Sequence, residues 1–580
     1  MATSPNAPSR LGGAFFTGLL LLSAASLMYE IVLTRLLSVV CWYYLAFVSV
    51  SMAMFGMTAG ALFVQLRPSL FAKELLPVRL YQSVLAMAIS MPLALLFMLA
   101  IPLDISLAAQ TAVSFVLFSS VIAVPFFFSG IAVCISLTRM PFSMGRIYFV
   151  DLGGAALGCL CAVALLSLVD APSAIFDISA ILFVSASAFA DYAQRTGSQR
   201  NCLIAVVSMI LVAGVNSSTV HGIQPIWSKG KIDAREYIFS EKWNPISKVR
   251  LYDAERTPPY LWGPSPRTPD FMIEAMVLDI DNSASTEITR FNGDLSALPF
   301  LRYDVTSIAA PLRRGGSAAI IGVGGGRDVL NCAVNGFHRI VGIEVNSAIA
   351  DITSRQLDSF SGFSKIPGFE LHQDEGRSYL TRSGERFDLI QASLVDTWAA
   401  TSAGAMTLSE NSLYTVEGWR VFYEHLKPGG IITFSRWYRD STKSETYRLY
   451  GVAYAAMLSE GVADPASHLA LIQSGPIATL LASNQPFSPQ DIASLKKTSS
   501  EMVFTILAMP GEPLAIPELQ RISETKTVAA MASLRTENGL DYSPTFDSSP
   551  YFFNPIHLRS LPRFFSSYVV LPNLNAMWFL

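Results

Sequence analysis

The sequence predicts a helical membrane domain with several spans, followed by an α/β domain built on a parallel sheet. Apolar stretches fill the first 220 residues, and several reach the roughly 20 residues that a bilayer span needs. From residue 313 onward, short apolar strands alternate with helical segments, which is typical of a parallel sheet covered by helices on both faces. The run 317–328 joins one such strand to a glycine-rich turn that opens a helix.

The composition agrees with a membrane protein. Of 580 residues, 51% are hydrophobic and 15% are charged, which is too apolar for an ordinary soluble chain of this size. The net charge of -3 provides no basic field, so nucleic acid is not an expected partner. Most of the six cysteines lie in or beside apolar segments, and neither a disulfide framework nor a metal site is indicated.

Residues 1–220 are predicted to form a polytopic membrane domain of six or seven spans, with the lipid bilayer as a partner. The first span is too long for the apolar region of a cleavable signal peptide, so we interpret it as an anchor. The expected spans are 12–37, 42–66, 80–102, 108–137, 148–169 and 171–190, with a shorter seventh at 201–216.

Several charged residues lie inside these spans. Glu30 and Arg35 fall in the first span, and Asp151 and Asp177 fall in later ones. Unpaired charge in hydrocarbon costs several kcal/mol, so these side chains are expected to face protein, water or each other. We expect a buried Glu30–Arg35 pair or an interfacial bracket that orients helices, and a substrate or proton path is the alternative. The small residues of 153–158 suit close helix packing.

The soluble part is predicted in three sections. Residues 221–312 read as a polar, Pro-rich linker and a small β module, with alternating runs at 271–291. Residues 313–440 form the sheet core, and 441–580 an α/β extension and tail. The core elements are expected to be strands at 317–322, 339–344, 368–373, 387–392 and 430–435, with helices at 327–336, 347–357 and 415–426.

The glycine-rich turn predicts a site for a nucleoside cofactor. Gly322, Gly324 and Gly326 permit positive φ and close approach of the backbone to a ligand, and the helix that opens at Arg327 presents free N–H groups. Glu344, about 20 residues further along, ends the next strand, where a carboxylate can accept hydrogen bonds from ribose hydroxyls. The alternative is that these glycines only form a tight turn.

Polar residues also follow the third and fourth strands of the core. Asp374, Glu375 and Arg377 come after the third strand, and Ser393 and Asp396 lie at the end of the fourth or beyond it. Ligands of open parallel sheets bind outside the carboxyl ends of the strands, so these loops and the glycine turn are expected to converge on one crevice.

The order of these motifs over 278–436 resembles the spermidine synthase family, which shares the Rossmann-like fold of class I S-adenosylmethionine-dependent methyltransferases. The glycine turn, Glu344, the Glu375-Gly-Arg377 loop and the Leu426-Lys-Pro-Gly-Gly430 motif carry the resemblance. The amino-terminal spans are similar to those of bacterial membrane-fused members, which implies a multi-pass protein of the bacterial inner membrane. The resemblance implies S-adenosylmethionine or its decarboxylated form as cofactor, and a small acceptor, either an amine or lipid-like.

Two motifs depart from the family. Where spermidine synthases have an Asp-Ser-Ser-Asp-like loop, this chain has Ser393-Leu-Val-Asp396, which keeps the second acid and loses the first, the expected base. The nearest counterpart of the family's Tyr-His-Glu run is Tyr303-Asp-Val, which keeps only the tyrosine. Both departures weaken the case for aminopropyl transfer to a polyamine.

The segment 395–414 is expected to be a lid or binding loop, because loops of this length in compact domains usually serve binding. We expect Asp396 to orient or deprotonate a nucleophile, Trp398 to wall the acceptor pocket, and Glu410 and Tyr414 to hold polar acceptor groups. The alternative is that Glu410 caps the helix near 415 and Tyr414 is a core aromatic residue.

Three functions therefore stay open. The first is a membrane-integral, spermidine synthase-like transferase that alkylates a small acceptor. The second is a methyltransferase acting on a lipid or a membrane-delivered small molecule. The third is a non-catalytic nucleoside-binding sensor. A dehydrogenase using NAD is disfavoured by the Leu426–Gly430 motif and the acidic third loop, and the sequence does not indicate an oligomeric state.

The side of the membrane is also open. With seven spans, the loop arginines and lysines all fall on the side of the amino terminus, so the positive-inside rule places everything after residue 220 outside the cytoplasm. A nucleoside cofactor is made in the cytoplasm, and on that ground we prefer a cytoplasmic soluble domain.

Overall fold

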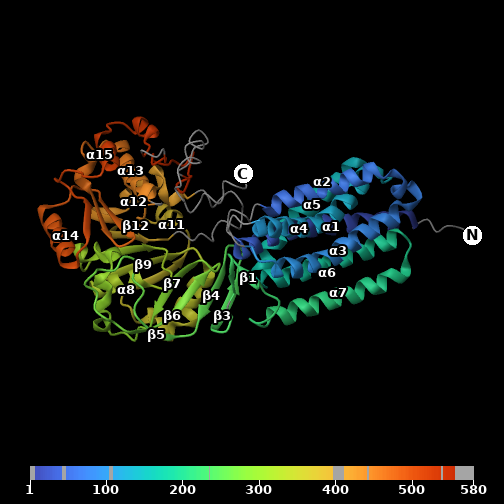
Figure 1. The fold of residues 1–580 in the computed structure, drawn as a ribbon, viewed down its shortest axis with the longest axis horizontal. Helices are drawn as coiled ribbons and strands as arrows, with labels where there is room; N and C mark the ends of the chain where they lie inside the picture. The colour runs from blue at the N-terminus through green and yellow to red at the C-terminus, as the bar shows by residue number, and fades with distance from the viewer. Residues whose placement is uncertain are drawn as a thin grey trace, which may run out of the picture.

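The computed structural model describes residues 7–41, 48–103, 109–233, 235–395, 411–440, 443–536 and 540–554. An elongated bundle of helices forms one end of the molecule, and the β-sheets with their covering helices form the other (Figure 1). The fold class expected from the sequence is confirmed.

Among the described residues, seven helices are long and apolar enough to cross a membrane, by length and composition, so the chain is a multi-pass membrane protein. The short apolar stretch near 201–216 is one of them. The helices are α1 (Ala7–Val40), α2 (Val48–Leu66), α3 (Leu76–Ala100), α4 (Ala109–Arg139), α5 (Met144–Leu166), α6 (Ala171–Tyr192) and α7 (Thr196–Ser217).

Glycines bring pairs of these helices into close contact. A Cβ atom at Gly154 or Gly158 of α5 would overlap backbone carbonyl oxygens of α1. The same holds for Gly56 and Gly60 of α2 against α4. Close helix packing by small residues, expected for 153–158, is therefore present, and only glycine fits at these crossings.

The expected Glu30–Arg35 pair is wrong. Arg35 lies at the end of α1 that faces the soluble part, and its guanidinium pairs with the carboxylate of Asp281. Both side chains are fully buried. Asp281 sits in the loop between the strands β6 (Ile273–Ile280) and β7 (Ala284–Thr289), so the partner of Arg35 comes from the β module. Inside the bundle, Asp151 accepts a hydrogen bond from Ser23 at 2.5 Å.

The β module next to the membrane helices is larger than expected. Beside a short hairpin of β1 (Trp227–Ser228) and β2 (Lys231–Ile232), it contains an antiparallel sheet with the path β3-β4-β6-β5, and β7 pairs with β6. The sequence predicted strands only near 271–291. The other strands are β3 (Ile238–Trp243), β4 (Lys248–Tyr252) and β5 (Glu255–Thr257).

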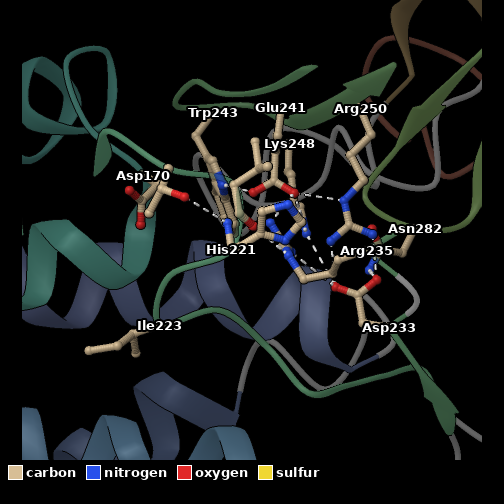
Figure 2. A network of polar contacts seen from close by, with 12 residues as sticks. Asp170, His221, Ile223, Asp233, Arg235, Glu241, Trp243, Lys248, Arg250 and Asn282 are labelled. Atoms are coloured by element: carbon tan, nitrogen blue, oxygen red, sulfur yellow. Dashed lines mark hydrogen bonds and ion pairs between the residues drawn. The ribbon is translucent and has the colours of Figure 1, made fainter. Parts of the chain in front are cut away.

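A buried charge network explains why β3 and β4 were not predicted from the sequence. Lys248 and Arg250 of β4 are buried, and both pair with Glu241 of β3 and with Asp233 (Figure 2). Arg235 adds a pair to Glu241 at 3.1 Å. Inward-facing charges remove the alternation of apolar and polar residues that marks a half-buried strand.

The main sheet has eight strands in the order β10-β9-β8-β11-β12-β14-β13-β15. The first five are parallel, and the last three join antiparallel. The chain runs from β8 outward to β10 on one side, then returns to β11 and β12 on the other, so the strand order reverses beside β8. The strands are β8 (Ser317–Ile321), β9 (Arg339–Glu344), β10 (Phe369–Gln373), β11 (Phe387–Ser393), β12 (Leu426–Trp437), β13 (Leu469–Ser474), β14 (Ile477–Ser483) and β15 (Thr505–Ala508).

Helices cover both faces of this sheet and bury its two cores. On one face, α8 (Arg327–Val334) and α14 (Pro489–Met502) pack over residues such as Ile320 and Leu389. On the other, α11 (Gly376–Arg382), α12 (Val416–Glu424) and α13 (Lys443–Ser459) pack over residues such as Ile390 and Phe434. The expected helix at 347–357 is divided into α9 (Ser347–Asp351) and a π-helical turn at Ile352–Gln356.

Candidate functional site

The glycine turn follows β8 at the point where the strand order reverses, which is where open α/β sheets bind ligands. Gly322, Gly324 and Gly326 have φ of 74°, 52° and 92°, values that side-chain-bearing residues rarely adopt. A Cβ atom at Gly325 would overlap the backbone carbonyl oxygen of Glu287 in β7. The turn is therefore held in one shape by its own backbone and by close packing against the β module.

Glu344 is joined directly to this turn. It ends β9, and its Oε2 accepts a hydrogen bond from the Gly324 N–H at 3.0 Å. Its Oε1 accepts one from the Asn346 N–H at 2.9 Å. The carboxylate is 5% exposed, and this burial raises the pKa of Glu344 above its usual value. The backbone N–H groups of Val323 and Val345 also favour its charged form, so four backbone N–H groups surround this carboxylate.

The acidic loop after β10 begins α11. Glu375 caps this helix, because its carboxylate accepts hydrogen bonds from the N–H groups of Arg377 and Ser378 at 3.0 and 2.7 Å. Asp374 accepts from the Glu375 N–H at 2.8 Å and pairs with Arg382. Both acids stand at the carboxyl end of β10, two strands from β8.

Arg377 joins the core to the carboxyl-terminal segment 540–554. Its two terminal nitrogens donate to the two carboxylate oxygens of Asp547, each at 2.7 Å. Asp547 also accepts from Thr415 at 2.7 Å. The guanidinium holds the pKa of Asp547 below its usual value. Arg377, expected in the substrate pocket, is thus engaged in an ion pair with the tail.

Ser393, at the carboxyl end of β11, lies near an acid that the sequence did not single out. This acid is Asp328, the second residue of α8, and the polar side chains of Ser393 and Gln391 favour its charged form. Gln391 also donates to the Ser393 hydroxyl at 3.2 Å. Asp328 is 7% exposed, and burial, aided by nearby Asp304, raises its pKa to about 6.

Aromatic rings and an arginine lie on the same face of the sheet as Ser393. Asp304 is fully buried and accepts hydrogen bonds from the N–H groups of Trp262 and Gly263 at 2.8 and 3.1 Å. Arg327 lies 3.5 Å from the Asp304 carboxylate and 5.4 Å from the centre of the Trp262 ring. The Trp262 ring meets that of Trp437, at the end of β12, edge to face at 6.0 Å. These aromatic residues were not singled out from the sequence.

The remaining site residues predicted from the sequence are Tyr303, Tyr414, Asp396, Trp398 and Glu410. Tyr303 packs against Phe271, with 5.7 Å between the ring centres. Tyr414 is 1% exposed and stacks on Phe552 at 4.4 Å, which fits the alternative that it is a core aromatic residue. Asp396, Trp398 and Glu410 lie outside the described residues.

The described residues form a multi-pass helical membrane domain followed by an α/β domain with a Rossmann-like, mostly parallel sheet. Among solved structures, the chain is similar to the spermidine synthase from Thermotoga maritima, with 15% identity over 51% of this chain and 87% of that one, and a TM-score of 0.30. It is also similar to a probable spermidine synthase from Corynebacterium glutamicum, with 14% identity, 51% and 96% coverage, and a TM-score of 0.32.

A third similar structure is human methyltransferase-like protein 13 in complex with SAH, with 14% identity over 34% of this chain and 89% of that one, and a TM-score of 0.25. At these identities the likenesses concern the fold alone. No protein-family model matches the chain.

Proposed function

We propose that this chain is a membrane-integral transferase that moves an alkyl group from S-adenosylmethionine or its decarboxylated form to a small acceptor. The observation that carries the proposal is the direct bond between the Gly324 N–H and Glu344 Oε2. This bond joins the glycine turn and the acid of the next strand into one rigid cradle beside the point where the strand order reverses.

The residues present fit a sulfonium nucleoside. Glu344, at the end of the strand beside the turn, would accept hydrogen bonds from the ribose hydroxyls. Asp374 and Glu375, at the end of β10, would stand on the adenine side. When bound, the donor supplies a carbon attached to a thioether leaving group that needs no protonation. The protein then has to position the acceptor and take up its proton.

Methyl transfer to a neutral or lipid-like acceptor is the second candidate, and one observation favours it. A polyamine is a cation and needs free carboxylates nearby. On the face of the sheet that carries Ser393, Asp304 is already satisfied by backbone N–H groups, and Arg327 lies over Trp262. A cationic acceptor would meet the charge of Arg327, whereas an apolar one would meet the aromatic rings.

We further propose that the soluble domain faces the cytoplasm, at the inner membrane of a bacterium. The cytoplasmic synthesis of the donor supports this orientation. The loop charges argue for the other side, because Arg67, Lys73, Arg139 and Arg195 lie at the ends of helices remote from the β module (Figure 1). The orientation therefore needs its own test, which is given in the Discussion.

Calorimetry on the full chain in lipid nanodiscs tests the donor site. S-adenosylmethionine, its decarboxylated form, methylthioadenosine and NAD are titrated in parallel, and we expect binding of a sulfonium nucleoside but not of NAD. Glu344→Gln should weaken this binding roughly ten- to a hundredfold, the worth of hydrogen bonds to a charged group. Glu385→Gln, which only alters an exposed pair with Arg339, is the matched control.

Product analysis then separates the candidates. Putrescine with decarboxylated S-adenosylmethionine should yield an aminopropylated amine under the first, and membrane lipid vesicles with S-adenosylmethionine should yield a methylated lipid under the second. Binding without any turnover would leave the sensor. If no sulfonium nucleoside binds, both transferase functions are wrong.

A further inference from the structure

The three most exposed large apolar side chains of the described soluble part follow one another closely, just after the membrane helices. Ile232 of β2 is 69% exposed, Tyr237 is 62% and Phe239 of β3 is 58%. Ile226, which is also exposed, joins this stretch because its carbonyl oxygen accepts a hydrogen bond from the Asp233 N–H at 2.9 Å. We call the four apolar residues the apolar edge. Exposed apolar patches of this kind mark surfaces that meet a partner.

We propose that the apolar edge lies in the interfacial layer of the bilayer and contacts lipid there. The partner is the phospholipid layer at the level of the headgroups and the first acyl carbons. The β module is then held at the membrane by its own surface as well as by the spans that precede it. This lipid contact does not depend on the transferase function proposed above.

Hydrogen bonds place the apolar edge at the ends of the spans. Lys229, in the turn between β1 and β2, donates its N–H to the Val40 carbonyl oxygen at the end of α1 at 2.7 Å. Arg235, two residues before Tyr237, donates its Nε to the Val220 carbonyl oxygen at 2.6 Å. β1 and β3 accordingly lie on the side of the β module that is next to the helix bundle (Figure 1).

The length of α7 sets the level of these contacts in the bilayer. α7 has 22 residues. At about 1.5 Å per residue it is about 33 Å long, close to the roughly 30 Å of a hydrocarbon core. Val215, in its last turn, is exposed and continues the lipid-facing surface to the end of the helix. Val220, which Arg235 contacts, comes just after Ser217, the last residue of α7. The apolar edge therefore stands at the height of the lipid headgroups.

Near the apolar edge, charged and apolar side chains are distributed in the reverse of the order that a surface facing water shows. Glu241 of β3 is buried and pairs with the buried Lys248 and Arg250 of β4 (Figure 2), whereas Tyr237 and Phe239 are exposed. Charged residues are rarely buried in soluble domains, and then only as pairs. Tyrosine is enriched at membrane–water interfaces, because its ring meets the acyl chains while its hydroxyl stays in water.

The exposed charges between the apolar residues offset each other. Lys231 and Glu236 are both exposed and carry opposite charges. Attraction to anionic lipid is therefore not what holds this surface at the membrane. Burial of apolar area in the interface acts without it, so we expect the contact in bilayers of zwitterionic phosphatidylcholine alone.

A second copy of this chain is the other occupant that an edge strand could bind. β3 pairs only with β4 among the described strands. However, this pairing is irregular between Ile238 and Ser240, at the position of Phe239. Bulges of this kind turn an edge away from strand pairing. The irregular edge and its closeness to the ends of the spans both favour lipid as the occupant.

The test puts one fluorescent label at a time on the full chain, in phosphatidylcholine nanodiscs that hold one chain each. Cys159 and Cys161 are the exposed native cysteines, so both are first replaced by alanine. Ile232→Cys or Phe239→Cys then carries an NBD fluorophore. Both positions are exposed, so neither change opens a cavity in the core.

Met272→Cys is the matched control in the same β module. Met272 is 50% exposed. It stands just before β6, at the end of that strand remote from the membrane, and about 27 Å from the other end at about 3.4 Å per residue. A label there should meet water in any orientation that keeps the spans in the bilayer.

Lipid-borne and water-soluble quenchers should rank these positions in opposite order. A nitroxide on the acyl chain near the headgroup should quench the labels at Ile232→Cys and Phe239→Cys at least about twofold and leave the Met272→Cys label almost unchanged. The reason is that interfacial side chains reach about 5–10 Å into the boundary between headgroups and acyl chains. Iodide in the buffer should quench the Met272→Cys label most.

Two results would overturn the proposal. If iodide quenches all three labels alike and the lipid nitroxide quenches none, the apolar edge faces water. If the labels at Ile232→Cys and Phe239→Cys are shielded from both quenchers, and only in nanodiscs that hold two chains, a second copy covers the edge instead of lipid. Neither result bears on donor binding or turnover, so the transferase function is tested separately.

Discussion

The Arg35–Asp281 pair joins the membrane bundle to the soluble part. We expect its removal to increase local opening of the β6–β7 hairpin. Arg35→Met keeps the length and apolar volume of the side chain but leaves the Asp281 carboxylate unpaired at 0% exposure. Asp281 Oδ1 keeps its hydrogen bond from the Lys248 N–H at 2.7 Å. Asp281 Oδ2 has no hydrogen-bond partner within the described residues.

Breaking a buried pair by removing one partner typically costs about 3–5 kcal/mol, because an uncompensated charge stays buried. Lys229 remains beside Asp281 and donates to its backbone oxygen, so we expect the lower end of this range. At about 1.4 kcal/mol per factor of ten, local opening of the β6–β7 hairpin should increase roughly a hundredfold.

Hydrogen exchange on the full chain in nanodiscs measures this opening directly in peptides of β6 and β7. Arg290→Met is the matched control, because Arg290 pairs with Glu274 of β6 at 2.8 Å but both side chains are about half exposed. An exposed pair contributes about 0–1 kcal/mol, so the control should change exchange fivefold at most.

Arg35→Met combined with Asp281→Asn should restore most of the protection. Asparagine tolerates the positive φ of 52° at this position and keeps an oxygen for the Lys248 N–H. If Arg35→Met exchanges no faster than the control, or if the double variant stays as open as the single one, the pair does not hold the hairpin and the reasoning is wrong.

Four further outcomes are expected. Gly325→Ala should weaken donor binding at least tenfold in calorimetry, because the new Cβ would overlap the Glu287 carbonyl oxygen. Gly384→Ala is the control and should leave donor binding unchanged, because Gly384 has open space around it. Arg377 lowers the pKa of Asp547, so docking of the tail should be fully stable above the ordinary carboxyl pKa of about 4 and be lost as pH falls through the lowered value. Hydrogen exchange of residues 540–554 measures this docking. Arg377→Met should abolish its pH dependence. Asp396→Asn should reduce turnover without changing donor affinity, and full turnover would refute its assigned role. A cysteine introduced at position 384 should react with an impermeant maleimide only after cell lysis, and labelling of intact cells would contradict the cytoplasmic orientation.

Local patterns predicted the core strands closely. The strands expected at 317–322, 339–344 and 387–392 correspond to β8, β9 and β11 within a residue at either end. These strands are buried on both faces and form continuous apolar runs between turn signals, which is the pattern that a sequence shows most directly. β12 begins earlier than expected, at Leu426, because Leu426 pairs with Phe387 across an irregularity in the register.

Features that depend on distant residues could not be predicted. The carboxylate that pairs with Arg35 lies outside its own helix, since Asp281 is 246 residues away. Asp328 carried no motif, because its position in a helix does not reveal which strand it faces. Only the strand order, which places β11 beside β8, brings it near Ser393. The alternation of strands and helices predicted a parallel sheet but not the order of its strands.

The β6–β7 hairpin connects the two parts of the molecule that the sequence shows separately. Its loop holds the carboxylate that pairs with Arg35 at the end of α1, and β7 carries Glu287, against whose carbonyl Gly325 packs. The turn at 281–283 is followed by four residues of β7, Ala284 to Glu287, which rise about 10 Å at 3.4 Å per residue. All four are held in register with β6. A shift of the hairpin at the membrane would therefore be transmitted to the glycine turn, because the paired backbone between them has little freedom to absorb it.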